Sequence, residues 1–346
     1  MNSKNTDHSE TERAVEKHKL KKVKKGVVLP RKNAEKVKKD ASPTDNKDMS
    51  PTAKPLGAPV NGLLQTCVGP LTEYQVIPEN IPKHAAVLAA GKRRTGKSTS
   101  FDNMMEKVMA HIPFGIVMTE TKLNGFWQRR VPERFVYQGL RDDILSNLVA
   151  RQRHLVEKFG PDDPRIFAFV ILDDVIADQN AIRYGKLINS LFTEGRHLKI
   201  SVWITTQYMK GIGPMIRGNC DIVIAQPIYG ETDRDVLHKL FANFLPKKEF
   251  MMLMDEVVRS EELPGHTANE PKLAVRVLVI EDHRQVPDAL KKFHYWEPVH
   301  SDELSDYKLC DPIYWKKDHL EGGNLEHKKT KNVGETFRHI NKVLKL

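Results

Sequence analysis

The stretch AAGKRRTGKSTSF, residues 89–101, has two glycines separated by four residues and followed at once by lysine and serine. Gly91, Gly96, Lys97 and Ser98 complete the pattern G-x-x-x-x-G-K-[ST], which is typical of a loop that binds phosphate groups. The apolar run HAAVLAAG precedes this loop, and KSTSFDNMMEKVMAHI follows it with apolar residues at helical spacing. The sequence therefore predicts a strand, a phosphate-binding loop and a helix in succession.

Each residue type in the loop has a physical role toward a bound triphosphate. The glycines let the backbone curl so that N–H groups point inward, and the amino end of the next helix adds positive charge. We expect Lys97 to reach the β- and γ-phosphates, Ser98 to ligate Mg²⁺ and Thr99 to assist at the α-phosphate. The expected nucleotide-binding residues are Gly91, Lys92, Arg93, Arg94, Thr95, Gly96, Lys97, Ser98 and Thr99.

Three of these residues carry an open question. Lys92, Arg93 and Arg94 occupy the variable positions of the loop, where backbone N–H groups serve the phosphates and side chains face outward. The sequence leaves open whether these side chains contact nucleotide oxygens or acidic residues of a neighbouring subunit.

A second motif supplies the acids that a phosphate-binding loop of this kind needs. FVILDDV, residues 169–175, is an apolar strand that ends with Asp173 and Asp174. We expect Asp173 to associate with Mg²⁺ and Asp174 to orient or deprotonate the attacking water. Many ATPases carry a glutamate at the second position, so the shorter reach of Asp174 leaves its role open.

A third motif, ISVWITTQ at residues 200–207, ends in polar residues. Gln207, with Thr206 beside it, is predicted to sense the γ-phosphate and the water, although a capping or packing amide is the alternative. Just upstream, Arg196 and His197 lie in a predicted turn, and such an arginine can project into a neighbouring subunit's site. A plain surface arginine is equally consistent with the pattern, and Arg217 is a second candidate.

The rest of the chain alternates between strand and helix patterns, which predicts an α/β fold with a largely parallel sheet and helices on both faces. The predicted strands are FGIVMTE, RFVYQG, RIFAFVILDDV, KISVWITTQ, GNCDIVIAQP and LAVRVLVIED, with KFHYWEP as an edge strand. The predicted helices after the loop helix are DDILSNLVARQRHLVEKFG, AIRYGKLINSLFTEGRHL, TDRDVLHKLFANFL and KKEFMMLMDEVVRS. At least one predicted strand, FGIVMTE, lies in the sequence between the phosphate-binding loop and the acids Asp173 and Asp174. This order favours a P-loop NTPase of the additional-strand ATPase type. The guanine-recognition motif N-K-x-D is absent from the sequence, which favours ATP over GTP as the bound nucleotide.

Charge and composition predict three regions. The chain has 346 residues and a formal net charge of +10 at pH 7. We predict a disordered basic region at 1–62, an ATPase domain at 63–298 and a basic extension at 299–346. The excess of lysine and arginine favours a polyanionic partner such as nucleic acid, although nuclear import and simple solubilisation remain open for the amino-terminal lysine clusters.

The sequence disfavours integral membrane proteins and secreted proteins. The sequence has no apolar run long enough for an integral membrane segment and no apolar core of a signal peptide, so secretion is not expected. Cys67, Cys220 and Cys310 are far apart and are predicted to be free thiols in a reducing compartment.

The motifs GKRRTGKS, FVILDDV, TEGRH, ISVWITTQ and PMIRGNCDIVIA occur in an order that resembles the genome-packaging ATPases of nucleocytoplasmic large DNA viruses. Those poxvirus-type enzymes are related to the FtsK/HerA DNA pumps, and the resemblance covers about residues 80–285. It implies a homo-oligomeric ring, a pentamer or hexamer, that drives double-stranded DNA into a preformed capsid. By the same resemblance, Lys97 and Ser98 bind nucleotide and metal, Asp173 and Asp174 are the Walker B pair, Gln207 is the sensor and Arg196 is the trans arginine.

The resemblance also implies ATP and Mg²⁺ as cofactors, capsid vertex or portal proteins as partners, and a place in the virion or in a virus factory of the host cytoplasm or nucleus. Two alternatives remain open at this point. One is a cellular or plasmid-type DNA pump or helicase of the FtsK/HerA kind. The other is a regulatory NTPase whose basic tails bind nucleic acid or membranes.

Overall fold

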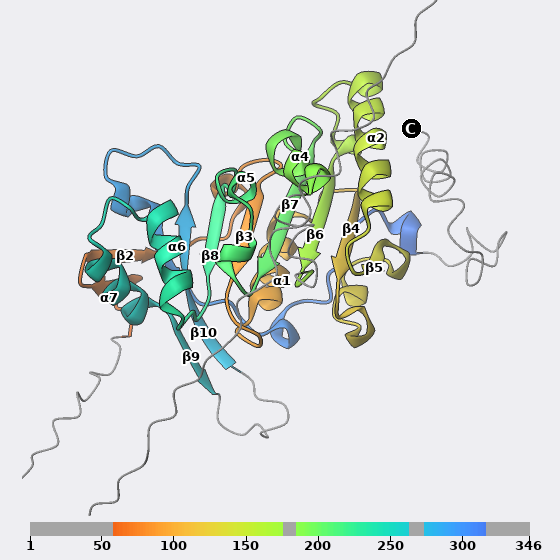
Figure 1. Cartoon of the computed structure of the whole chain (residues 1–346). Helices are drawn as coiled ribbons and strands as arrows, with labels where there is room; N and C mark the ends of the chain where they lie inside the picture. The colour runs from red at the N-terminus through yellow and green to blue at the C-terminus, as the bar shows by residue number, and fades with distance from the viewer. Residues whose placement is uncertain (1–57, 176–184, 263–272, 316–346) are drawn as a thin grey trace, which may run out of the picture. The chain divides into compact units, whose positions relative to one another are not determined.

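The computed structural model describes residues 58–175, 185–262 and 273–315. Their centre is an eleven-stranded sheet in the order β1-β2-β11-β10-β8-β3-β7-β6-β4-β5, with β9 paired to β10 (Figure 1). Most of the predicted disordered region at 1–62, and the end of the chain from residue 316, lie outside the described residues.

Six neighbouring strands form a parallel core. They are β8 (Ile222–Ala225), β3 (Ala86–Ala90), β7 (Ile200–Thr206), β6 (Ala168–Asp173), β4 (Phe114–Thr119) and β5 (Val136–Gln138). Each pairs in parallel with its neighbours in that order. Every residue of β3, β4, β6, β7 and β8 is buried, as expected for strands covered by helices on both faces. The predicted α/β fold is confirmed.

An antiparallel extension continues the sheet beyond β8. β10 (Leu273–Glu281) pairs with β8 and with β11 (Phe293–Trp296), and β2 (Gly69–Glu73) joins β11 to β1 (Leu63–Thr66). The prediction that KFHYWEP is an edge strand is wrong. β2, which the sequence pattern did not reveal, covers the other side of β11 by pairing with His294 and Tyr295.

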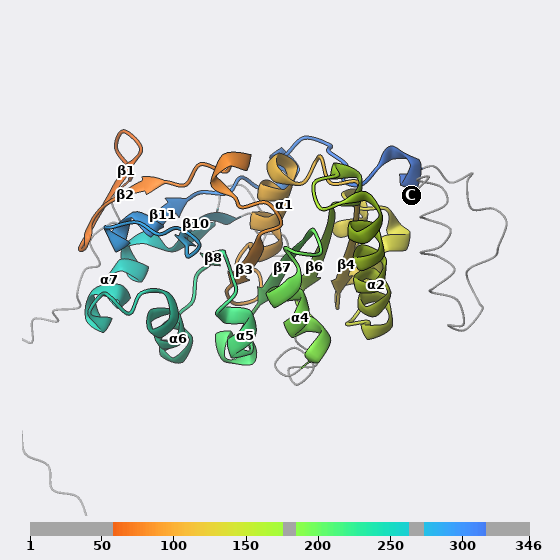
Figure 2. The ribbon, with the colours of Figure 1, turned by 90° about the horizontal axis from the view of Figure 1, so that it is seen from above.

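The helices are α1 (Lys97–Val108), α2 (Asp142–Phe159), α4 (Lys186–Glu194), α5 (Pro214–Arg217), α6 (Glu231–Phe241) and α7 (Lys247–Val257). Seen from above, α2, α4, α5 and α6 line one face of the sheet, whereas α1 lies on the other (Figure 2). The helix predicted for KKEFMMLMDEVVRS ends early, because its last residues begin β9 (Arg259–Glu262). Residues 181–184 of the helix predicted at 181–198 lie outside the described ranges.

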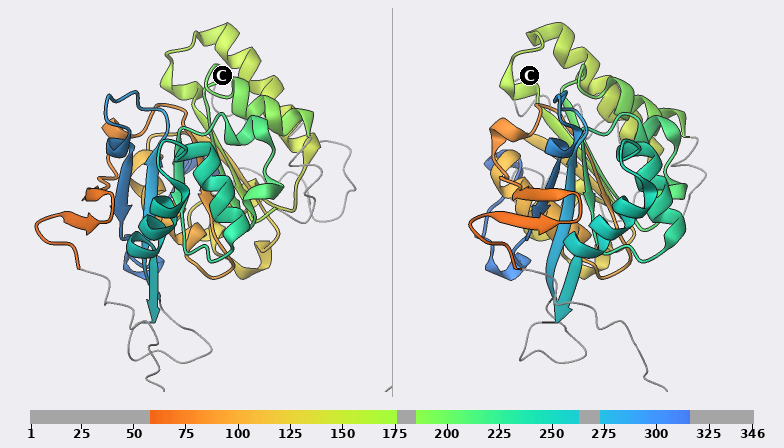
Figure 3. Two further views of the ribbon diagram at one scale, coloured as in Figure 1. Left: turned by 60° about the vertical axis from the view of Figure 1, so that its left-hand side comes forward. Right: turned by 90° about the vertical axis from the view of Figure 1, so that its left-hand side faces the viewer.

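Short 3-10 helices complete the described structure at Pro78–Asn80, Lys122–Asn124, Trp127–Arg129, Glu133–Phe135, Pro164–Ile166, Met209–Gly211, Ala289–Lys292, Ser301–Glu303 and Pro312–Trp315. β9 and the start of β10 project past the rest of the sheet (Figure 3). Because β10 runs antiparallel to β8, this projecting hairpin extends beyond the carboxyl end of β8.

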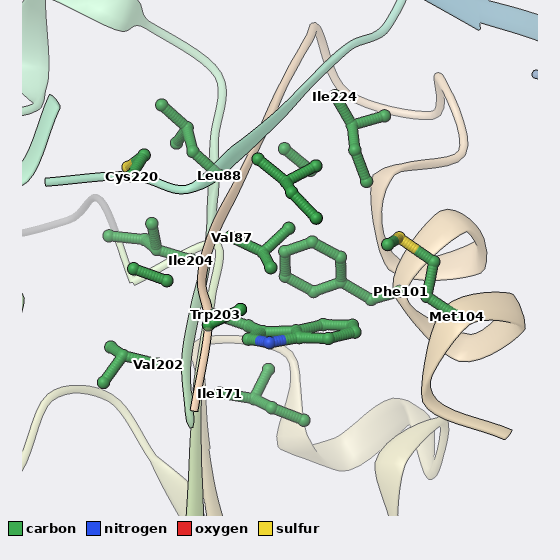
Figure 4. Packing of buried hydrophobic residues seen from close by; sticks show 14 of the residues in the cluster. Val87, Leu88, Phe101, Met104, Ile171, Val202, Trp203, Ile204, Cys220 and Ile224 are labelled. Atoms are coloured by element: carbon green, nitrogen blue, oxygen red, sulfur yellow. The ribbon is translucent and has the colours of Figure 1, made fainter. Parts of the chain in front are cut away.

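Helix α1 is anchored to the sheet by its apolar side. Phe101 and Met104 point toward Val87 and Trp203 of the central strands (Figure 4). The rings of Phe101 and Trp203 meet edge to face with centroids 5.0 Å apart. Full burial of one such side chain stabilises the fold by about 1.5–3 kcal/mol. These contacts fix the helix whose first turn carries the phosphate-binding residues.

The other side of α1 is covered by residues that follow β11. Asp102 of α1 accepts hydrogen bonds from Arg130 Nε (2.9 Å) and from the Tyr307 hydroxyl (2.5 Å). The Arg130 guanidinium also donates to the carbonyl oxygen of Ser305 at 3.0 Å. Leu309 N in turn donates to the carbonyl oxygen of Arg130 at 2.8 Å. The start of the predicted carboxyl-terminal extension is thus part of the packing around α1.

Candidate functional site

Most of the predicted site residues meet where the parallel strands of the sheet end. The loop of residues 91–96 joins β3 to α1, and Gly91 N donates to the carbonyl oxygen of Thr206 at the end of β7 (3.0 Å). In the sheet, β7 lies between β3 and the acid-bearing strand β6. The inserted strand is therefore β7, whereas β4 and β5, which precede the acids in the chain, lie beyond β6.

The loop passes too close to β8 for a side chain at its first glycine. A Cβ atom added to Gly91 would lie 2.4 Å from Cβ of Gln226 and 2.8 Å from the Thr95 hydroxyl. Gln226 follows β8, is fully buried, and donates from Nε2 to the Ser100 hydroxyl at 2.6 Å. Gly96 has φ +88°, a conformation that glycine adopts without strain. Both glycines of the motif are thus required by the backbone path.

Lys97 folds back over the loop. Its ammonium donates to the carbonyl oxygen of Lys92 at 2.8 Å, and the Thr95 hydroxyl donates to the same oxygen at 2.8 Å. Burial lowers the pKa of Lys97, while the charges of Asp174 and Asp173 act in the opposite direction. A desolvated ammonium beside a phosphate-binding loop suits an anion such as a phosphate.

Ser98 and Asp173 are in direct contact. The Ser98 hydroxyl lies 3.0 Å from Oδ1 and 3.2 Å from Oδ2 of Asp173, although the two residues are 75 positions apart. A hydroxyl and a carboxylate are hard oxygen ligands, and Mg²⁺ in triphosphate sites is held by one or two such groups together with phosphate and water. The residues present therefore fit the Mg²⁺ ion that the loop motif implies.

Two further residues hold the Asp173 carboxylate. The indole N–H of Trp127 donates to Oδ2 at 2.7 Å, and the Thr205 hydroxyl donates to Oδ1 at 2.9 Å. Burial raises the pKa of Asp173 above its ordinary value, and the hydrogen bonds from Trp127, Thr205 and Ser98 oppose that rise. These donors orient the carboxylate and favour its ionised form.

Asp174 lies beside Gln207, as their predicted roles require. The Gln207 amide nitrogen is 2.7 Å from both carboxylate oxygens of Asp174. Asp174 has φ +54°, and its backbone N–H donates to the Thr205 hydroxyl at 2.8 Å. Positive φ is uncommon outside glycine, and here it occurs where the chain leaves the extended conformation of β6. One amide and one carboxylate are thus placed together beside the loop.

Three residues that contact the site were not predicted from the sequence: Trp127, Thr205 and Gln226. Thr205 could have been predicted, because successive side chains of a strand point to opposite faces. Thr205 and Thr206 therefore lie on different faces of β7, and each should have been considered as a neighbour of the acids. Thr206 in fact bonds its own turn, since its hydroxyl is 3.0 Å from the carbonyl oxygen of Tyr208. Trp127 has no signal in the sequence, since it reaches Asp173 from the loop after β4 through tertiary packing.

Arg196 and His197 do not join this cluster. Both are exposed in the turn before β7, at the end of the strand opposite Gln207. The seven residues of β7 separate the two ends by about 20 Å. Arg217 is partly buried, and one of its guanidinium nitrogens lies 3.4 Å from the carbonyl oxygen of Met209, in the segment after Gln207. Arg196 is therefore placed away from its own chain's site.

The basic side chains of the loop face outward. Lys92, Arg93 and Arg94 are all exposed, and Arg94 has φ +59°. Lys92 Nζ lies 5.6 Å from the centroid of the Tyr229 ring.

In the described ranges, no helix combines the length and apolar character needed to cross a membrane.

The relatives of the chain are proteins of large DNA viruses. Protein 015R of Frog virus 3 is 27% identical over 175 residues, 50% of this chain and 53% of that protein. Protein 075L of Invertebrate iridescent virus 6 is 31% identical over 49% of this chain and 66% of its own length. Protein L437 of Acanthamoeba polyphaga mimivirus is 23% identical over 61% of this chain and 71% of its own length. All three are described as uncharacterized.

The match thus spans between about half and about two thirds of the first two relatives. No family model matches the chain. Among solved structures, the genome packaging NTPase B204 of Sulfolobus turreted icosahedral virus 2 aligns with 63% of this chain and 100% of its own, at 14% identity and a TM-score of 0.42. The pCW3 conjugation coupling protein TcpA aligns with 64% of this chain and 62% of its own, at 13% identity and a TM-score of 0.42. The expected relationship to proteins of large DNA viruses is confirmed by the sequence relatives.

Proposed function

We propose that this protein is an ATP hydrolase that moves double-stranded DNA, and that its work is to package a viral genome into a preformed capsid. The observation that supports ATP hydrolysis is a pair of contacts beside the loop: Ser98 contacts Asp173, and Gln207 contacts Asp174. The first pair suits a metal ion and the second suits a water molecule. Both lie at the edge of the sheet where the phosphate loop begins.

Each residue then has a defined task. Lys97 binds the β- and γ-phosphate oxygens, and Ser98 with Asp173 holds Mg²⁺, which when bound neutralises phosphate charge. Gln207 orients the attacking water through its amide, and Asp174 accepts the proton of that water. The contact between Gln207 and Asp174 keeps both groups on the same side of the loop.

Two observations support the proposal that hydrolysis drives DNA movement: the positive net charge of the chain and the viruses to which its sequence relatives belong. The net charge of +10 favours a polyanion, and a motor that must accept any sequence binds the phosphate backbone rather than the bases. The sequence relatives belong to viruses with large DNA genomes. A homo-oligomeric ring at a capsid vertex, within the virion or a virus factory, is part of this proposal.

The exposed position of Arg196 leaves its side chain accessible to a neighbouring subunit of a ring. A head-to-tail interface repeated around a closed ring would bring the turn before β7 of one subunit toward the site of the next. An arginine in that place would neutralise charge that develops during phosphoryl transfer.

The test is ATP hydrolysis by the full chain with and without double-stranded DNA. We expect DNA to stimulate hydrolysis and Lys97→Ala to abolish it in both conditions. The matched control is Lys158→Ala, which removes an exposed lysine of α2 and should leave both rates unchanged. Hydrolysis that depends on Lys97 but ignores DNA would overturn the motor and leave the nucleotide site intact.

A further inference from the structure

The side of the loop that faces β8 presents an exposed aromatic ring. Tyr229 is 65% exposed, which is unusual for a large ring next to a buried strand end. Its backbone follows the buried residues Pro227 and Ile228, and Arg234 Nε donates to the carbonyl oxygen of Ile228 at 2.6 Å. The ring is thus held out from a fixed piece of backbone at the start of α6.

The ring lies beside Lys92 of the loop. The Lys92 ammonium lies over the Tyr229 ring, 5.6 Å from its centroid, and such a cation–π contact draws the ring toward the loop. Val275 of β10 borders the same side, since its Cγ2 atom is 3.6 Å from a Cβ placed on Gly96. An aromatic face and an aliphatic side chain therefore flank the loop on the β8 side.

The order of the strands indicates which end of a bound nucleotide, the terminal phosphate or the nucleoside, lies on the β8 side of the loop. Asp173, Asp174 and Gln207, which act on the terminal phosphate under the proposed function, follow β6 and β7 on one side of β3. A nucleotide whose phosphates lie in the loop must extend its nucleoside away from these groups. The opposite side of β3 is β8, and Tyr229 is the exposed ring that follows it.

We propose that Tyr229 is the platform on which the adenine base of the bound nucleotide stacks. This inference rests on the proposed ATP site and adds the subsite that holds its base. Stacking of a base on an aromatic ring contributes about 1–3 kcal/mol, which corresponds to about 5- to 150-fold in affinity. The phosphates do not share in this contact, because they lie within the loop.

The experiment measures binding of ATP and of inorganic tripolyphosphate by calorimetry, with Mg²⁺, on the full chain. Tyr229→Ala should weaken ATP binding about 5- to 150-fold and leave tripolyphosphate binding unchanged, whereas Tyr229→Phe should keep both. Tyr208→Ala is the matched control, because Tyr208 is 54% exposed but follows β7 on the other side of the loop. It should leave the ratio of the two affinities at the wild-type value.

The outcomes separate this inference from the proposed function. If Tyr229→Ala binds both ligands as wild type does, or loses both equally, the base platform is overturned. A change only in subunit association would overturn it as well, and would assign Tyr229 to an interface. If wild type binds neither ligand, the nucleotide site itself fails.

Discussion

Trp127 donates its indole N–H to Oδ2 of Asp173 at 2.7 Å, and both side chains are buried. This bond connects the loop after β4 to the acid at the end of β6. It restrains the carboxylate that faces Ser98, so that the oxygen ligands of the site are positioned before any metal binds. The same bond offsets part of the free energy lost when Asp173 is buried in ionised form.

Trp127→Phe should therefore lower the kcat of ATP hydrolysis about 10- to 150-fold, because a hydrogen bond to a charged group contributes about 1.5–3 kcal/mol. The matched control is Trp203→Phe. Trp203 is equally buried, and its indole nitrogen has no hydrogen-bond partner among the described residues, so this change removes ring volume without removing a bond. Equal loss of activity in the two variants would contradict the role given to Trp127.

The buried pair of Asp102 and Arg130 should govern stability rather than catalysis. Their side chains are 0% and 5% exposed, and Arg130 contacts the carboxylate at 2.9 Å. Asp102→Asn removes the buried charge partner of the guanidinium and leaves it only the exposed Asp306 carboxylate at 3.9 Å, so the free energy of unfolding should fall by about 3–5 kcal/mol. Urea denaturation of wild type and Asp102→Asn measures this change in the free energy of unfolding.

Glu194→Gln provides the comparison for that pair. Glu194 pairs with Arg153 at 3.3 Å, with side chains 51% and 58% exposed, and exposed pairs contribute about 0–1 kcal/mol. Similar losses in the two variants would show that burial of the Asp102 pair has no energetic weight.

His84 should make the fold sensitive to mild acid. Burial lowers the pKa of His84 to about 4, and the charges of Lys199, His111 and Lys83 act in the same direction. Between about pH 6.5 and 4 the unfolded chain binds a proton that the folded chain excludes, so stability falls as pH falls through this window. After allowance for partial exposure, the loss at pH 5 is about 1 kcal/mol.

Urea denaturation at pH 7 and pH 5 tests this expectation. His84→Asn keeps a residue type that tolerates the observed φ of +58° and removes the titrating ring. The variant should lose less stability between the two pH values than wild type does. An unchanged pH dependence would assign the acid sensitivity to other groups.

The trans role of Arg196 predicts complementation between defective subunits. Arg196→Ala should be inactive alone, because no subunit then supplies the arginine to its neighbour. Mixed with Lys97→Ala subunits, it should regain part of the activity, since intact sites of Arg196→Ala subunits receive Arg196 from Lys97→Ala neighbours. Absence of any recovery in mixtures that assemble together would remove Arg196 from the mechanism.

The parallel core was predictable because most of its strands are apolar runs followed by a helix pattern, and the loop motif identified the first of these units. β4 is an exception, since short 3-10 helices lead from it to β5. The same logic failed for β2 and β9. β2 contains Gly69 and Pro70, which are poor strand formers, and it is stabilised by pairing with distant β11. Only Val258 separates the end of α7 from the start of β9, so helix and strand patterns merge there.

Within the site, residues close to a motif were predictable and residues brought in by tertiary contacts were not. The acids at the end of β6 and the amide at the end of β7 follow from strand ends that meet at one edge of a parallel sheet. Trp127 and Gln226 come from loops whose path the sequence does not encode locally. Tyr229 becomes informative only when the strand order shows which side of the loop it occupies.

The most direct measurement of the central claim is displacement of a third strand from a DNA triplex by the full chain. A translocating motor strips the third strand only while it hydrolyses ATP. We predict displacement by wild type with ATP, and none with a non-hydrolysable analogue or with Lys97→Ala. ATP hydrolysis by wild type without any displacement, on DNA that it demonstrably binds, would contradict the claim that this protein moves DNA.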